Sequence, residues 1–292
     1  MELSREDAYL VWLITGCSSG FGEQFVRSAI SRGDKVIATA RNLDKIRHLE
    51  VDGVIIMRLD VTDEVQSINS AIEKAISIHG RIDVLVNNAA YVTIGLVEDL
   101  RHEDYLAQFN TNLFGTIKVT QAVLPHFRQR RSGTLLFLSS LSGWIGHPGC
   151  SAYAGSKFAL EGWAESLSGE VASFGIRTLL VEPGRYRTKL LSSGNMKPTT
   201  SNIPDYAEYS KNLVAAISGE SGKQPGDPVK LVETVVDLVR GEGIAWGKQI
   251  PFRLPMGLDC YDEILNKLEE TKRMLQIWGD VIRSTNFDQG NA

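Results

Sequence analysis

Tyr153 and Lys157 are the side chains whose types and spacing point most clearly to chemistry. They lie four residues apart in a segment with helical periodicity, so both project from the same face of a helix. A tyrosine with an ordinary pKa of about 10 is a poor acid or base near neutral pH, but a neighbouring ammonium group favours its phenolate. The pair can therefore exchange a proton with a substrate. Ser140 ends a predicted strand before Tyr153, where its hydroxyl can hold the substrate oxygen and stabilise developing charge.

A glycine-rich segment, residues 15–22, reads Thr-Gly-Cys-Ser-Ser-Gly-Phe-Gly and lies between a predicted strand and a predicted helix. Missing side chains in such a loop let backbone amides approach a pyrophosphate, and the helix N-terminus adds a favourable electrostatic field. A tight glycine turn without a ligand is the alternative for this motif alone. If the loop binds a dinucleotide, the contacting residues are Gly16, Ser18, Ser19, Gly20, Phe21 and Gly22.

The second predicted strand ends at Arg41 and lacks the carboxylate that holds a ribose 2′-hydroxyl in many dinucleotide sites. An arginine fork suits a 2′-phosphate instead, so the sequence predicts NADP(H) rather than NAD(H) as the cofactor. An exposed arginine at a helix start is the alternative. At the ends of the next two strands, Asp60 and Val61 are expected near the adenine, and Asn88 and Ala89 near the adenosine ribose.

Short apolar runs alternate along the chain with longer segments of helical periodicity. This alternation predicts an α/β fold, a Rossmann-type doubly wound parallel sheet with helices on both faces and ligands at the carboxyl ends of its strands. The predicted strands are residues 9–15, 35–40, 54–59, 82–87, 134–139 and 176–182. The predicted helices are residues 20–32, 63–79, 102–131, 151–174 and 227–240.

We expect the whole chain, 1–292, to form one domain with its cofactor-binding and catalytic core in residues 8–190. Residues 191–226 are polar and rich in Gly, Pro and Ser, and they are expected to form a lid over the substrate, lined by Tyr206, Tyr209 and Leu213. A surface loop plus a helix fits that segment equally well. Residues 227–292 would supply C-terminal helices, and the amphipathic part packs on the body or on a partner subunit.

Composition and charge exclude several classes of protein. The net charge of −4 offers no broad positive field, so neither nucleic acid nor an anionic membrane is an expected partner. Three cysteines and five histidines show no metal-ligand spacing, so we expect no metal and a reducing compartment. The N-terminus does not resemble a signal peptide, and no apolar run approaches the ~18 residues that span a bilayer, which predicts a cytoplasmic protein.

The motifs occur in the order and spacing of a known family, although a Tyr-xxx-Lys pair alone is common on solvated helix faces. The sequence resembles the classical short-chain dehydrogenase/reductases over about residues 9–190. The segments that carry this resemblance are the glycine loop, Asn87-Asn88-Ala89, Ser140, Tyr153-Ala-Gly-Ser-Lys157, Pro183-Gly184 and Thr188.

The resemblance implies a catalytic tetrad of Asn112, Ser140, Tyr153 and Lys157. In it, Tyr153 is the acid/base, Lys157 also binds the nicotinamide ribose, and Asn112 anchors a water-linked proton relay. The loop after the sixth strand would hold the nicotinamide carboxamide. Its expected contacts are Pro183, Gly184, Tyr186 and Thr188.

The sequence departs from the family pattern in two ways: Ala90 replaces a common glycine, and Arg185-Tyr186-Arg187 makes the nicotinamide loop bulky. Neither removes a catalytic group. The glycine loop with Arg41 resembles NADP(H)-using members related to 17β-hydroxysteroid and retinol dehydrogenases. The bulky loop and the C-terminal extension resemble many fungal members. The resemblance also implies a homodimer or homotetramer formed through the long helices that begin near His102 and Ser151.

Aromatic and apolar side chains between Ser140 and Tyr153 predict a pocket for a bulky lipophilic substrate, such as a secondary metabolite, steroid or retinoid. For His147, a structural or solvent-facing role is an alternative to substrate contact. The sequence predicts an NADP(H)-dependent oxidoreductase that interconverts a ketone or aldehyde and an alcohol. A non-redox epimerase or cyclase and a nucleotide-binding sensor remain open alternatives. The expected substrate-pocket residues are Tyr91, Leu141, Trp144, His147 and Tyr206.

Overall fold

A computed structural model describes residues 9–287, so the N-terminal features considered above, at residues 1–7, lie outside the described part. A seven-stranded sheet forms the centre of the molecule, in the order β3-β2-β1-β4-β6-β7-β9, and all its strand pairs are parallel. All six predicted strands are present. The strands are β1 (Val11–Ile14), β2 (Lys35–Ala40), β3 (Val54–Arg58), β4 (Val84–Asn87), β6 (Gly133–Leu138), β7 (Ile176–Pro183) and β9 (Arg253–Met256).

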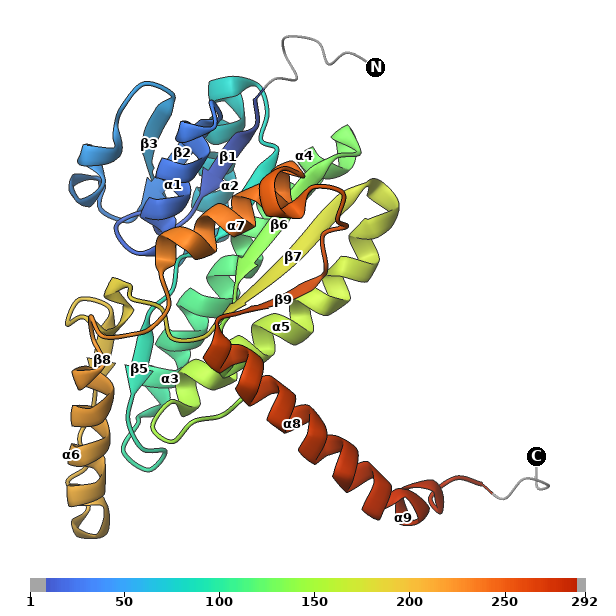
Figure 1. Cartoon of the computed structure of the whole chain (residues 1–292). Coiled ribbons are helices and arrows are strands. Elements are labelled where there is room, and N and C mark those ends of the chain that lie inside the picture. Colours follow the sequence, from blue (N-terminus) through green and yellow to red (C-terminus); the bar gives the residue numbers. More distant parts are fainter. Residues whose placement is uncertain (1–8, 288–292) are drawn as a thin grey trace.

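Helices cover both faces of this sheet, as Figure 1 shows. On one face, α1 (Phe21–Ser31) and α7 (Pro228–Arg240) contact each other and bury Phe25 and Val235 against Trp12. On the other face, α2 (Val65–His79), α4 (Thr116–Arg130) and α5 (Ser151–Val171) form the second core. The central strands are apolar on both sides because each side is covered. The predicted doubly wound α/β fold is confirmed.

The segment predicted as one helix over residues 102–131 is divided by a π-helical turn. It consists of α3 (His102–Phe109), the turn Asn110–Gly115 and α4. A π turn inserts one extra residue into a helix, which a hydrophobic periodicity of 3.6 does not reveal. The turn matters for the site because it carries Asn112.

Two strand pairings escaped the sequence pattern. Strand β9 lies at the edge of the main sheet and contains Pro255, which an edge position tolerates because its missing N–H faces away from the ladder. Strands β5 (Val92–Ile94) and β8 (Met196–Pro198) pair in parallel outside the main sheet. Helix α6 (Pro204–Gly219) follows β8, so much of residues 191–226 is ordered secondary structure.

The C-terminal segment forms α8 (Leu258–Ile277) and α9 (Gly279–Arg283). Figure 1 shows α8 leaving the body of the molecule, with α9 at its far end. Between residues 9 and 287, no helix combines the length and apolar character needed to cross a membrane. Short 3-10 turns occupy Leu43–Lys45, Arg47–Leu49, Leu141–Gly143, Ala172–Phe174, Lys189–Leu191 and Gly243–Ala245.

Candidate active site

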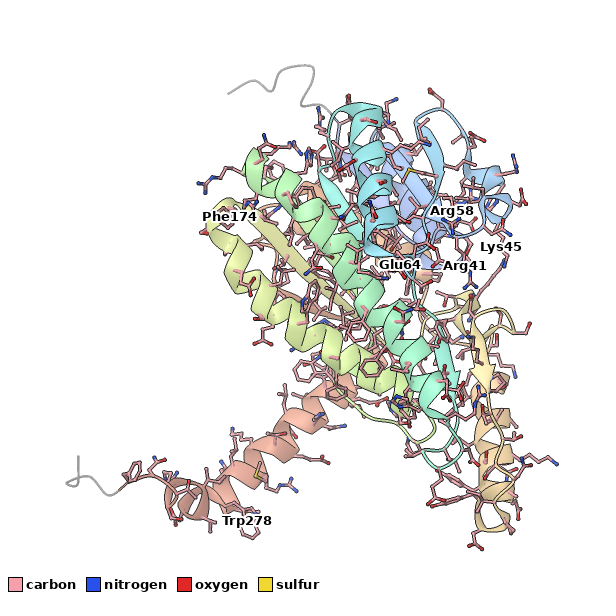
Figure 2. The ribbon with its side chains drawn as sticks, turned by 180° about the vertical axis from the view of Figure 1, so that it is seen from behind. Arg41, Lys45, Arg58, Glu64, Phe174 and Trp278 are labelled. Carbon is pink, nitrogen blue, oxygen red and sulfur yellow. The ribbon has the colours of Figure 1, made fainter. Side chains whose placement is uncertain are left out.

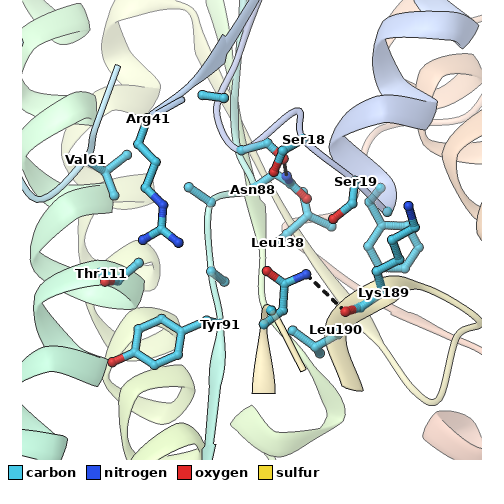
Figure 3. A pocket seen from close by; sticks show the side chains of 18 of the residues that line it. Ser18, Ser19, Arg41, Val61, Asn88, Tyr91, Thr111, Leu138, Lys189 and Leu190 are labelled. Carbon is cyan, nitrogen blue, oxygen red and sulfur yellow. Dashed lines mark hydrogen bonds between the residues drawn. The ribbon is translucent and has the colours of Figure 1, made fainter. Parts of the chain in front are cut away.

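A cavity of about 350 Å³ opens where the strands of the main sheet end (Figure 3). Its wall runs from the glycine loop after β1, past the ends of β2, β3 and β4, to the end of β6 and the first turns of α5. The sheet therefore brings together segments that are far apart in the sequence. The predicted site residues in this wall are Gly16, Ser18, Ser19, Gly20, Phe21, Arg41, Asp60, Val61, Asn88, Ala89, Tyr91, Tyr153, Lys157 and Thr188.

The glycine loop has a backbone that other residues could not follow. Gly20, at the start of α1, has a φ of 63°, in the left-handed region that favours glycine. A Cβ at Gly22 would lie 2.5 Å from the carbonyl oxygen of Gly16, so Gly22 permits close packing behind the loop rather than lining the cavity. Asn88 Nδ2 donates a hydrogen bond of 2.9 Å to the Thr15 carbonyl and braces the loop from β4.

The β2 end of the cavity is positively charged. Arg41 and Lys45 both line it, and Figure 2 shows them on the same side of the molecule. Figure 3 shows the Arg41 guanidinium extending between Val61 and Thr111. Burial raises the pKa of Asp60, but hydrogen bonds from Thr62 and the charges of Arg41 and Arg58 lower it to a net value below the ordinary one. Asp60 is therefore ionised, and its negative charge lies near Arg41.

Tyr153 lies in the first turn of α5 and is only 7% exposed. Burial raises the pKa of its hydroxyl to about 12, and the hydrogen bond with Ser140 partly offsets this effect. Ser140 is held in turn because its Oγ accepts a hydrogen bond of 3.1 Å from the Ser142 amide. At neutral pH Tyr153 is thus a neutral phenol, placed beside a serine hydroxyl.

Lys157 lies one turn further along α5 and is buried. Its Nζ donates a hydrogen bond of 2.6 Å to the Leu138 carbonyl and lies 5.7 Å from the centre of the Tyr153 ring. Burial lowers the pKa of Lys157 to about 8, while the nearby Glu161 acts in the opposite direction. Near neutral pH the ammonium form prevails, and its charge faces the phenol.

Asn112 is buried in the π turn before α4. Its Oδ1 accepts a hydrogen bond of 3.2 Å from the Tyr91 amide, and its Nδ2 donates one of 3.2 Å to Ser156 Oγ. These bonds tie the segment between β4 and β5 to α5 beside Lys157. The π turn aims the Asn112 side chain at both segments, a placement that is typical of functional sites.

Comparisons with known proteins agree with this arrangement. The family model described as short chain dehydrogenase matches residues 10–198. The chain belongs to the short-chain dehydrogenase family. Oxidoreductase BOA17 of Botryotinia fuckeliana is 37% identical over 280 residues, covering 91% of this chain and 98% of the relative. Human retinol dehydrogenase 8 is 33% identical over 246 residues and covers 78% of each chain. A short-chain dehydrogenase structure from Streptomyces avermitilis superposes with a TM-score of 0.84 at 35% identity, covering 96% of this chain and 99% of that one.

The protein is therefore an oxidoreductase of this family, whose members bind a nicotinamide cofactor, and the predicted family resemblance is confirmed. In this short-chain dehydrogenase, the loop after β7 meets the glycine loop: the Tyr186 ring packs against Phe21 with 5.6 Å between ring centres. Gly184 donates its amide to the Met256 carbonyl at 2.9 Å, and Pro183 ends β7. Of the four residues predicted to hold the carboxamide, Thr188 lines the cavity, and Pro183, Gly184 and Tyr186 lie outside its wall.

Four of the five predicted substrate-pocket residues lie outside the wall of the cavity. Tyr91 lines the cavity, with Lys197 Nζ 4.4 Å from its ring centre. Leu141 and Trp144 instead pack with Cys260 and Ile264 of α8, because that helix covers their loop. His147 pairs with Glu263 of α8 at 3.0 Å, and Tyr206 lies on α6, 38% exposed and outside the cavity wall. The apolar residues packed around Tyr153 are Val92, Ile94, Met196, Cys150, Leu190, Leu191, Val214 and Ile217.

A buried charged network beneath the serine turn was not predicted. Ser139 donates a hydrogen bond of 2.6 Å to Glu161, and Arg253 of β9 pairs with both Glu161 and Glu182, the latter at 2.7 Å. The Arg253 guanidinium also lies over the Trp144 ring, 4.5 Å from its centre. Burial raises the pKa of Glu161 to about 7. The only sequence signal was the four-residue spacing from Lys157 to Glu161, which by itself indicates nothing about Arg253.

Proposed function

We propose that this short-chain dehydrogenase is an NADP(H)-dependent oxidoreductase that interconverts a ketone or aldehyde and an alcohol on a bulky lipophilic substrate. One observation carries the proposal: Tyr153 and Lys157 line the same cavity as the glycine loop, and Ser140 hydrogen-bonds Tyr153 from just outside the cavity wall. A carbonyl oxygen between the two hydroxyls would lie within reach of both a hydrogen-bond donor and a proton donor.

The residues present fit a phosphorylated dinucleotide. The glycine loop presents backbone without side chains at the N-terminus of α1, which suits a pyrophosphate. Arg41 and Lys45 at the β2 end, with no carboxylate at that strand end, suit a 2′-phosphate and support NADP(H) over NAD(H). When bound, the nicotinamide would supply or accept the hydride, with Thr188 and Lys157 holding its end of the cofactor.

The chain's own residues perform the proton chemistry. Ser140 hydrogen-bonds the carbonyl oxygen and orients it towards Tyr153. Tyr153 donates its hydroxyl proton to that oxygen as negative charge develops there, and the Lys157 ammonium stabilises the phenolate that remains. Asn112 would hold the relay that returns a proton to Lys157. A phenol that is protonated at neutral pH can serve as the proton donor that reduction requires.

The surroundings of Tyr153 support a lipophilic substrate. Apolar side chains of β5, β8 and α6 pack around the tyrosine, including Val92, Ile94 and Met196. Human retinol dehydrogenase 8, a relative of this chain, is named for a lipophilic alcohol. We therefore infer that the part of the substrate beyond the carbonyl is apolar and binds under α6.

Turnover of a substrate panel tests this function. Purified enzyme would be assayed for oxidation of NADPH, and separately of NADH, with lipophilic ketones, aldehydes and quinones. We expect turnover with NADPH and a fall in kcat of about 10²–10⁴ in Tyr153→Phe. Tyr9→Phe is the matched control, because Tyr9 precedes β1 at the end away from the glycine loop and its ring contact with Arg81 is kept. Tight NADPH binding without turnover of any carbonyl would contradict the proposal.

A further inference from the structure

Helix α8 carries a row of exposed apolar side chains along most of its length. Their exposed fractions range from 41% for Leu265 to 76% for Leu258. Figure 1 shows that α8 leaves the body, and Figure 2 places Trp278, just beyond its end, far from the sheet. A contiguous apolar surface of this kind marks an interaction site. The members of the row are Leu258, Tyr261, Leu265, Leu268 and Leu275.

The row is distinct from the face with which α8 contacts its own body. That inner face buries Cys260 and Ile264, and Lys267 donates a hydrogen bond to the Trp144 carbonyl. The inner face is thus already occupied. At 100° per residue, the exposed row lies roughly a quarter turn around the helix from this inner face. The described part of the body does not cover it.

The spacing of the row is that of a coiled coil. Its residues recur at alternating intervals of three and four, as the a and d positions of a heptad do, and Lys272 fills the one remaining a position. A single lysine at an a position fixes the register and orientation of a pair at some cost in stability. The pattern therefore indicates a helical partner rather than a flat apolar surface.

We propose that α8 pairs in antiparallel orientation with α8 of a second copy of this chain. In the register that this pattern allows, Leu265 faces Leu268 of the second copy, and Leu258 faces Leu275. Lys272 then faces Tyr261 of the second copy, with which it makes a cation–π contact. It also lies beside Asp262 of the second copy, with which it forms an ion pair. By two-fold symmetry each contact occurs twice.

The shape of the molecule favours this orientation. The body lies at the N-terminal end of α8, so antiparallel helices place the two bodies at opposite ends of a seam that spans about 26 Å. A parallel pair would force both bodies to the same end. Helix α8 carries five acidic and three basic side chains, which disfavours docking on an anionic lipid surface. The proposed seam is separate from the long helices α4 and α5.

Charge exchange across the seam tests the proposal by sedimentation equilibrium of the full-length chain. Lys272→Asp would place an aspartate beside Asp262 of the second copy. Because the two carboxylates repel each other, we expect the dimer dissociation constant to rise at least about tenfold. Adding Asp262→Lys should restore the wild-type dissociation constant, because the charges are then exchanged. Glu270→Lys, on the polar face of the same helix, is the control. The proposal would be overturned if the double variant dimerised as weakly as Lys272→Asp, or if Lys272→Asp dimerised as strongly as the wild type.

Cysteine cross-linking tests the register even if other surfaces also hold the assembly together. A chain with Leu265→Cys and Leu268→Cys should form disulfide-linked dimers under mild oxidation. Asn266→Cys with Glu270→Cys, on the polar face, should not. Circular dichroism and NADPH binding would verify that each variant is folded. A monomeric wild type, cross-linking equal to the control pair, or a monomer that floats with anionic vesicles would contradict the proposed seam.

Discussion

Burial controls the protonation of the two side chains at the centre of the proposed chemistry. It raises the pKa of Tyr153 to about 12 and lowers that of Lys157 to about 8, so each group is pushed towards its neutral form. For Tyr153 the neutral form is the acid that reduction requires. For Lys157 the charged form is the useful one, and it is lost within an accessible range of pH.

Reduction should therefore lose efficiency in alkaline solution. We expect kcat/KM for the ketone to be constant below about pH 8. Above that pH we expect it to fall, because Lys157 loses its proton. The Tyr153 proton, with a pKa of about 12, is retained over that range. The measurement is kcat/KM from about pH 6 to 10 in wild type and in Lys157→Arg, where the guanidinium keeps its charge. A fall near pH 8 in both proteins, or in neither, would assign the profile to another group.

Arg41 offers a second prediction at the scale of one side chain. We expect Arg41→Ala to raise the KM for NADPH about 10- to 100-fold, because a charge-assisted contact with the 2′-phosphate is lost. The KM for NADH and both kcat values should change little. Arg47→Ala is the matched control, since Arg47 is exposed and pairs with Asp44. An equal rise in KM for both cofactors would show that Arg41 does not distinguish them.

Sequence patterns located these residues because their motifs are local. The glycine loop and the Tyr153–Lys157 spacing each lie within eight consecutive residues. Lys45 and Lys197 were missed because they reach the cavity only once β2, β5 and β8 are placed. Trp144 was assigned to the substrate pocket from its type and position, and it instead packs with α8, whose path no local pattern specifies.

At the scale of elements, β9 connects the C-terminal part of the chain to the catalytic serine turn. Arg253 of β9 bonds Glu182 of β7 and Glu161 of α5, and Glu161 accepts the hydrogen bond from Ser139. The turn that carries Ser140 thus rests on a strand more than a hundred residues later in the sequence. The sequence did not predict β9, because arginine and proline in a short edge strand resemble a loop.

Removal of that guanidinium should affect both stability and catalysis. Arg253→Met leaves two buried carboxylates without their cation, so we expect a loss of about 3 kcal/mol in the free energy of unfolding. We also expect kcat to fall more than the KM for NADPH changes, because the turn supports Ser140, which contacts Tyr153 rather than the glycine loop. Urea titration and steady-state kinetics measure these effects. Arg253→Lys should be intermediate in both respects, and Arg128→Met, on the exposed part of α4, should match wild type. A wild-type kcat in Arg253→Met would show that the ion pairs of Arg253 with Glu161 and Glu182 do not contribute to catalysis.

The π turn before α4 shows another limit of sequence patterns at this scale. Helical periodicity predicted one helix over residues 102–131, and the helical path is indeed continuous there. The π turn within Asn110–Gly115 carries Asn112, whose side chain bonds Tyr91 and Ser156. Only the family resemblance identified Asn112, because the periodicity contains no signal for a π turn.

At the scale of the whole molecule, the alternation of strands and helices was sufficient to predict the fold. Right-handed crossovers place all the strand ends at one edge, and the strand order reverses between β1 and β4, where ligands bind in such sheets. The motifs therefore meet there. The destination of α8 could not be predicted, since an amphipathic helix fits a partner subunit as well as its own body. The structure shows one face against the body and another exposed.

The central claim is hydride transfer between the nicotinamide and a carbonyl carbon, with Tyr153 as the proton donor. The most direct measurement uses NADPH with deuterium at both C4 positions and follows the label into the product by mass spectrometry. The proposed reaction predicts one deuterium at the carbinol carbon, and product formation about 10²–10⁴ slower in Tyr153→Phe while NADPH binding is unchanged. A product without deuterium, or equal product formation in Tyr153→Phe, would contradict it.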